Sequence, residues 1–234
     1  NNMTTLTLHV SRSLSRSWQP GDEILVTRLD HDANYSPWVL AAKDRGVTVR
    51  EVRFHPEDGT LDLDDLRRKL EGRPKLLAVG YASNALGTIN PIRQIAAEAR
   101  ARGIAVLVDG SQAVPHMAVD VQALGVDFYA FTGHKMFGPT GTGALWARRE
   151  ILESMPPFLG GGEMIRTVRF EGSTWAEPPH RFEAGTPNIA GFIGLGAAFS
   201  TVATTGAASL PFGVGRIIAG ATFSLGLVLV VVAG

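Results

Sequence analysis

The feature that most constrains the fold is an alternation of short apolar runs with amphipathic segments through residue 147. The apolar runs are typical of buried strands, and the amphipathic segments are typical of helices, one of them with Asp62 at its N-cap. Strands and helices in alternation indicate a mainly parallel sheet sandwiched by helices. The sequence therefore predicts an α/β fold with strands at 23–27, 47–52, 76–79, 104–108, 128–131 and 144–147 and helices at 38–45, 63–71 and 91–102.

Polar side chains follow several of these predicted strands. In open α/β sheets, ligands bind beyond the carboxyl ends of the strands, so polar residues at those positions are the first candidates for a site. The candidates are His31, Asn84, Asp109, Gln112, Thr132, His134 and Lys135.

Asp109 and Lys135 each close an apolar run, about 25 positions apart. Taken alone, Asp109 could equally be a helix cap, and a lone lysine is usually solvated. A lysine at a sheet edge can also be partly desolvated, which lowers its pKa and frees its amine to attack a carbonyl. Pyridoxal phosphate needs such a lysine, an acid beside its ring nitrogen, and hydroxyl or amide donors for its phosphate. The pair therefore favours a pyridoxal-phosphate site.

Composition excludes several other functions. The chain has 22 basic and 22 acidic residues, whereas a nucleic-acid-binding domain usually has a basic excess. It has no cysteine, which excludes disulfides, Cys-ligated metals and a thiol nucleophile within these residues. No metal site and no nucleic-acid partner are predicted.

Five ordered motifs carry a resemblance to a known family. They are LDHDAN at 29–34, ASNALGT at 82–88, DGSQAV at 109–114, TGHKMFGPTG at 132–141 and RFEAGTPN at 181–188. The chain resembles the class V aminotransferase family over about residues 1–198, and within it the Suf-type cysteine desulfurase and selenocysteine lyase group. The resemblance implies that residues 1–188 form the large domain of a fold-type I pyridoxal-phosphate enzyme, without the N-terminal part of that domain.

The resemblance also implies residue roles. Lys135 would bind the cofactor covalently and later move the Cα proton of the substrate, while Asp109 would pair with the ring nitrogen and His31 would stack on the ring. Asn84 and Gln112 would contact the phenolic oxygen or the substrate. The phosphate would be held by Thr4, Thr5, Thr132 and His134. Thr186 would reach the phosphate of a neighbouring subunit, which implies a homodimer.

The implied reaction removes sulfur or selenium from cysteine or selenocysteine to give alanine, and passes it to a sulfur-acceptor protein in iron–sulfur cluster assembly in the cytoplasm. Asp32 replaces a second histidine of the Suf-type motif. The chain also lacks the sulfur-accepting cysteine and the small domain of the family, so we expect it to be inactive or incomplete. The alternatives are another class V lyase or aminotransferase, and a non-enzymatic chimeric fragment.

The last 51 residues have a different composition. From Ala184 to Gly234 the only charged residue is Arg216, and both 189–206 and 217–234 are uncharged over 18 residues. This length approaches a membrane span, so residues 189–234 are predicted to be an apolar helical segment, with membrane association through 210–234. Residues 203–229 resemble the first two helices of formate/nitrite transporters, which suggests a chimeric junction near 190–200.

Overall fold

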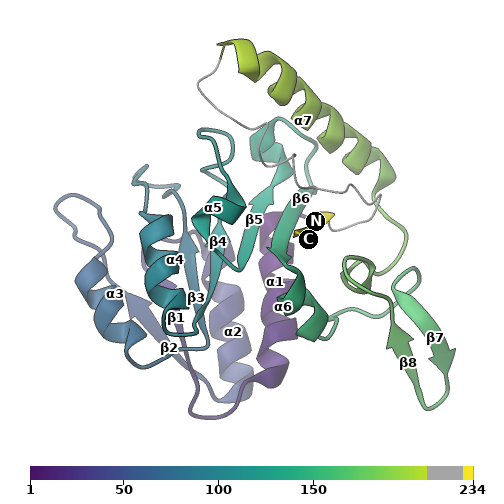
Figure 1. Ribbon diagram of the computed structural model, residues 1–234, viewed down its shortest axis with the longest axis horizontal. Coiled ribbons are helices and arrows are strands. Elements are labelled where there is room, and N and C mark those ends of the chain that lie inside the picture. Colours follow the sequence, from purple (N-terminus) through teal and green to yellow (C-terminus); the bar gives the residue numbers. More distant parts are fainter. Residues whose placement is uncertain (210–228, 234) are drawn as a thin grey trace.

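The computed structural model describes residues 1–209 and 229–233, with side chains described as far as residue 200. Its centre is a seven-stranded sheet in the order β2-β1-β3-β4-β5-β6-β9 (Figure 1). Neighbouring strands are parallel except for β5 and β6, which are antiparallel. The strands are β1 (Glu23–Thr27), β2 (Thr48–Val52), β3 (Leu76–Gly80), β4 (Ala105–Asp109), β5 (Phe128–Thr132), β6 (Gly143–Arg148) and β9 (Leu229–Ala233). The predicted α/β fold is confirmed.

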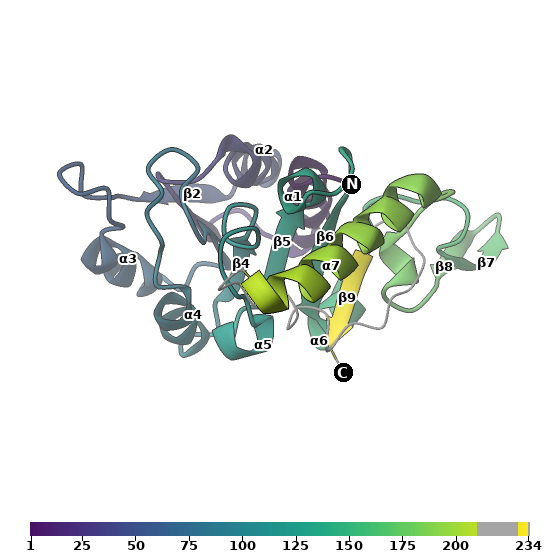
Figure 2. The same cartoon turned by 90° about the horizontal axis from the view of Figure 1, so that it is seen from above.

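Helices cover both faces of the sheet (Figure 2). One apolar cluster joins the sheet to α1, α2 and α6, and a second joins its other face to α3, α4, α5 and α7. The helices are α1 (Met3–Leu14), α2 (Ser36–Arg45), α3 (Leu63–Leu70), α4 (Ile92–Arg100), α5 (Val121–Leu124), α6 (Arg149–Ser154) and α7 (Ile189–Ser209).

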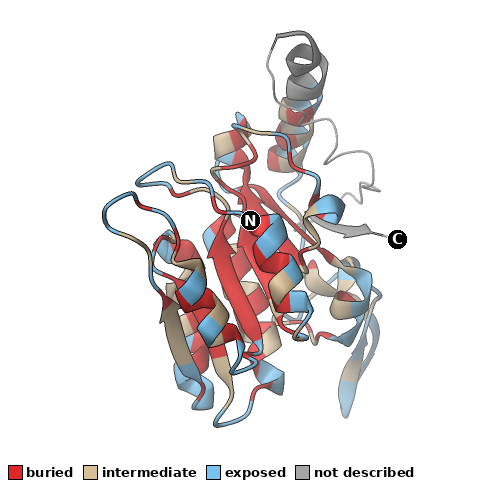
Figure 3. Ribbon diagram, turned by 60° about the vertical axis from the view of Figure 1, so that its left-hand side comes forward, coloured by how far each residue is buried: buried red, intermediate tan, exposed pale blue. Residues whose placement is uncertain are grey.

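The central strands are buried on both faces (Figure 3). Every residue of β3 and β5 is buried, whereas β2 at the edge of the sheet is only partly covered. This burial explains why the central strands are continuous apolar runs rather than alternating ones.

Local signals in the sequence account for several helix ends. The Asp62 carboxylate accepts the N–H of Asp65 at 2.8 Å, which confirms the predicted N-cap of α3. Helix α2 ends at Gly46, whose φ of +66° is accessible to glycine at little cost. A hairpin of β7 (Ile165–Arg169) and β8 (Gly172–Trp175) was not predicted.

The structure corrects part of the predicted apolar tail. Residues 229–233 form β9, which pairs in parallel with β6, and are not the end of a helix over 217–234. Its sequence, LVVVA, is rich in β-branched valine, which favours extended strands. Residues 189–206 do lie within a helix, α7. Among the residues that the structure describes, no helix is long and apolar enough to cross a membrane. The remaining predicted helical residues, 210–228, lie outside the described part.

Candidate active site

The carboxyl ends of β1, β4 and β5 and the N-terminus of α1 surround a cavity of about 410 Å³. Drug-sized ligands occupy cavities of roughly 300–1,000 Å³, so this one has room for a small molecule. Six of the predicted site residues line it: Thr4, His31, Asp109, Thr132, His134 and Lys135.

Asp109 is the last residue of β4 and is only 8% exposed. Burial raises the pKa of its carboxyl, because removal from water disfavours the charged form. The backbone N–H of Ser111, which donates to Asp109 Oδ1 at 2.8 Å, and the charges of Lys135 and His31 act in the opposite direction. A cation bound in the cavity would therefore favour the carboxylate form of Asp109.

Lys135 lies on a tight 3-10 turn, Gly133–Met136, that directly follows β5. A Cβ on Gly133 would lie 2.2 Å from Thr142 Oγ1, so only glycine fits at this position. The N–H of Gly138 donates to the carbonyl of Gly133 at 3.0 Å, and Thr132 pairs with Gly143 across the β5–β6 ladder. The lysine is thus carried by a turn that is anchored at both ends.

The end of the cavity near α1 is rich in hydrogen-bonding groups. Thr132 is 3% exposed, and its hydroxyl lies 2.9 Å from His134 Nδ1. Asn2 caps α1 and accepts both the N–H and the hydroxyl of Thr5, at 3.1 and 3.2 Å. A helix N-terminus beside hydroxyl and imidazole groups is suited to an anion such as a phosphate.

His31 caps the short 3-10 turn Asp32–Asn34 after β1. Its Nδ1 accepts the N–H of Ala33 at 3.0 Å, which fixes the ring and leaves Nε2 to carry the proton in the neutral form. The ring is exposed at the cavity, where it can contact a bound ligand.

Four predicted residues do not line the cavity: Thr5, Asn84, Gln112 and Thr186. Asn84 and Thr186 are exposed, and the Thr5 hydroxyl is bound by Asn2. Their predicted contacts with a ligand or a second subunit stay predictions. The prediction missed six residues that do line it: Asn2, Met3, Ala33, Ser111, Thr140 and Gly141. Ser111, Thr140 and Gly141 belong to the same motifs as Asp109 and Lys135. Their closeness in sequence to those two residues is the feature that could have indicated that they line the cavity.

The sheet and the site at its carboxyl edge together define the α/β domain of the fold-type I class, in which a lysine and a buried carboxylate face one ligand cavity. The chain belongs to the class-V aminotransferase family, since the aminotransferase class-V model matches residues 2–210. The match continues through 190–200, so it gives the predicted chimeric junction no support.

Known proteins agree with this placement. A "Probable cysteine desulfurase" of Xylella fastidiosa (strain 9a5c) is 58% identical over 186 residues, which are 80% of this chain and 44% of that protein. The crystal structure of the cysteine desulfurase CsdA from Escherichia coli superposes with a TM-score of 0.83 at 38% identity, over 92% of this chain and 52% of that one.

A structure of a C-DES mutant with glycine covalently linked to its PLP cofactor gives a TM-score of 0.75 at 30% identity, over 85% of this chain and 53% of that one. The chain thus spans about half the length of the relatives it matches.

Proposed function

We propose that the chain is the pyridoxal-phosphate-binding large domain of a cysteine desulfurase that acts on cysteine or selenocysteine. The observation that carries this proposal is that Lys135 and the buried Asp109 line the same cavity at the carboxyl edge of the sheet. The similarity to proteins named cysteine desulfurase favours this activity over another class V lyase or aminotransferase.

The residues present fit the cofactor. The cavity holds an amine, a buried carboxylate and, at the α1 end, hydroxyl and imidazole groups, which are the donor set that pyridoxal phosphate requires. When bound, the cofactor supplies an electron sink for charge that develops at the Cα of an amino acid.

Each side chain then has a defined task. Lys135 would hold the cofactor covalently and move a proton at the substrate Cα, and Asp109 would keep the ring nitrogen protonated. His31 would pack against the ring. Thr132, His134 and the N-terminus of α1 would hold the phosphate. We place Asn84 and Gln112 near the substrate, and Thr186 near the site of a second copy in a homodimer.

Acceptance of the sulfur needs a group from outside these residues. The 234 residues contain no cysteine, so they offer no thiol to form a persulfide. The similarity to proteins named cysteine desulfurase supports the further proposal that the protein passes sulfur to an acceptor protein, in the cytoplasm, for iron–sulfur cluster assembly.

The first prediction tests the cofactor site. Purified chain titrated with pyridoxal phosphate should develop the yellow absorbance of lysine-bound cofactor, and Lys135→Ala should abolish it because Lys135 is the only lysine among the described residues that line the cavity. Lys43→Ala, which removes an exposed lysine at the end of α2, is the matched control and should keep the colour. Asp109→Asn should weaken binding by roughly tenfold or more, because the ring nitrogen loses its anionic partner. Equal colour in the chain and in Lys135→Ala would contradict the proposal.

A further inference from the structure

A second buried carboxyl, that of Asp30, lies beside Asp109 on the same face of the sheet. Asp30 follows β1 and immediately precedes His31. The Thr27 hydroxyl donates to Asp30 Oδ2 at 3.0 Å, and the N–H of Asp30 donates to the Thr27 carbonyl at 3.3 Å. Its other oxygen, Oδ1, lies against Gly80, whose backbone acts on it, but it forms no hydrogen bond of good geometry among the described residues. An ionised carboxylate normally accepts well-formed hydrogen bonds at both oxygens, so a negative charge on Asp30 would be poorly compensated here.

The carboxyl of Asp30 is held against the strand next to Asp109. Its Oδ1 lies 2.5 Å from where a Cβ on Gly80 would lie, so any larger residue at 80 would displace it. Gly80 is the direct register partner of Asp109 across β3 and β4. Register partners on adjacent parallel strands point their side chains to the same face, so the approach of Asp30 to Gly80 brings its carboxyl beside Asp109 on that face of the sheet.

The charges around the two carboxyls differ. Within the part of the chain that the structure describes, no lysine, arginine or histidine forms an ion pair with Asp30; the groups that act on it are Thr27, Gly80 and Asp109. Asp109 instead interacts with Lys135 and His31. Burial raises the pKa of Asp30 well above its usual value; the hydrogen bond from the Thr27 hydroxyl and the backbone of Gly80 and Thr27 oppose this shift, and the negative charge of Asp109 adds to it.

Two neighbouring buried carboxyls share one negative charge more easily than they hold two. The cationic groups, Lys135 and His31, act on Asp109 and not on Asp30. The negative charge of the pair is therefore more stable on Asp109, and the proton is more stable on Asp30. We propose that Asp30 is a positioning residue that carries the proton of the Asp30–Asp109 pair, so that Asp109 is the single carboxylate presented to the cavity.

The role of a neutral Asp30 in cofactor binding rests on the proposed function. A neutral Asp30 does not compete with Asp109 for the cation of the ring, and its hydrogen bonds to Thr27 hold the loop that carries His31. The location of the proton, by contrast, is a property of this chain without any ligand.

The test therefore uses the full chain without pyridoxal phosphate. Urea unfolding of the chain and of Asp30→Asn is compared from pH 4 to 9. A group whose folded pKa is raised stabilises the fold most below its unfolded pKa and loses that stabilisation as pH rises to the folded pKa. Asn cannot ionise, so the folding equilibrium constant of Asp30→Asn relative to wild type should rise by up to tenfold per pH unit above pH 4, and then level off.

Asp32→Asn, which removes an exposed carboxylate two residues away, is the matched control and should give a ratio that changes little with pH. A ratio for Asp30→Asn that is flat or falls with pH would overturn the proposal. If Asp30→Asn does not fold, carbon-13 NMR of the wild-type carboxyls decides the question. Asp30 should titrate at higher pH than Asp109, and the reverse order would overturn the proposal. Both measurements are made without pyridoxal phosphate, so they test the location of the proton even if the chain does not bind the cofactor.

Discussion

At the scale of single residues, the motif DGSQAV owes its glycine to packing. A Cβ on Gly110 would lie 2.1 Å from the hydroxyl oxygen and Cζ of Tyr129, which is far inside contact distance. Tyr129 is a fully buried residue of β5, the strand next to β4. The glycine after Asp109 therefore makes room for a neighbouring strand's side chain, and this requirement lies outside the usual reading of Asp-Gly as a turn signal.

The same tyrosine gives a stability prediction. Its hydroxyl has no hydrogen-bond partner in the described part of the chain, so it is buried at a cost. Tyr129→Phe should leave the free energy of unfolding unchanged or raise it by up to about 1 kcal/mol. In the control Tyr35→Phe, the lost hydroxyl donates to Glu51, and we expect a loss of about 1 kcal/mol. Urea denaturation measures both, and a clear loss for Tyr129→Phe would show that its hydroxyl has a partner.

Much of the site could be predicted from the sequence at this scale. Asp109 and Thr132 end apolar strands, His134 and Lys135 lie on the turn that follows β5, and the carboxyl ends of parallel strands meet at one edge. The same logic also selected Asn84, which is exposed on a loop and does not line the cavity. Position at a strand end does not fix the direction of a side chain, and that direction depends on loop geometry.

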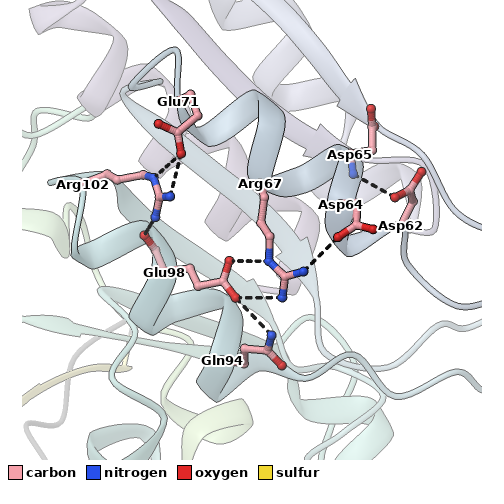
Figure 4. A network of polar contacts seen from close by, with 8 residues as sticks. All are labelled: Asp62, Asp64, Asp65, Arg67, Glu71, Gln94, Glu98 and Arg102. Carbon is pink, nitrogen blue, oxygen red and sulfur yellow. Dashed lines mark hydrogen bonds and ion pairs between the residues drawn. The ribbon is translucent and has the colours of Figure 1, made fainter.

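At the scale of elements, α3 and α4 are joined by ion pairs (Figure 4). Arg67 donates to both carboxylate oxygens of Glu98 at 3.0 and 3.1 Å, and Arg102 donates to Glu71 at 2.6 and 3.1 Å. One partner of each pair is well exposed, Arg67 at 42% and Glu71 at 68%, and the other is partly exposed, so water and salt screen the attraction. They orient the two helices and contribute little to overall stability.

A more deeply buried carboxylate ties α3 to β2. Burial opposes ionisation of Asp65, but hydrogen bonds from the Lys69 ammonium and from the backbone N–H of Arg53 outweigh it and lower the pKa to about 2. The side chain of Asp65 is 7% exposed. Loss of the carboxylate would leave the Arg53 N–H without its acceptor and the Lys69 ammonium with only the Glu51 carbonyl, to which it donates at 2.6 Å.

The Asp65 site predicts a pH-dependent loss. A group with a lowered folded pKa stabilises the fold above its unfolded value, near 4, and loses this stabilisation as pH falls toward 2. Asp65→Asn should therefore cost about 2 kcal/mol at pH 7 and visibly less at pH 3. Asp64→Asn, at a side chain 79% exposed, should cost under about 0.5 kcal/mol. Denaturant unfolding at the two pH values checks this, and an equal deficit at both would refute it.

Helices and strands could be predicted from the sequence where apolar residues recur with a clear spacing, and less well in segments without such a spacing. The buried strands β3, β4 and β5 and the amphipathic helix α4 follow directly from their patterns. The hairpin β7–β8 is largely exposed and has no apolar period to reveal it. The sequence predicts a helix where β9 forms, because an uncharged apolar run of this length fits either type of element and only the β-branched valines favour a strand.

At the scale of the whole molecule, stability depends on two apolar clusters separated by the sheet. Leu77 of β3 belongs to one cluster and Leu107 of β4 to the other, and both are fully buried. Because the two clusters share the same strands, damage to either should destabilise the entire fold rather than one layer.

Truncation of either leucine tests this coupling. Leu77→Ala and Leu107→Ala should each lower the free energy of unfolding by about 3 kcal/mol, with one transition and an unchanged denaturant slope. Leu40→Ala, at a residue 50% exposed on α2, should cost under about 1 kcal/mol. Fluorescence and circular dichroism should give coincident curves, and separate transitions would mean that the two layers unfold independently.

The docking of the chain's first residues onto β6 has a consequence for the order of folding. The carbonyl of Asn1 lies 2.6 Å from where a Cβ on Gly143 would lie, and α1 packs on β5 and β6, more than 100 residues away in sequence. Contacts of such high sequence separation form late, because the chain must close a long loop before it gains them. The cavity includes Asn2, Met3 and Thr4, so it is complete only when α1 is packed on the sheet. A ligand bound in the cavity would therefore hold these sequence-distant parts of the chain together and stabilise the folded state.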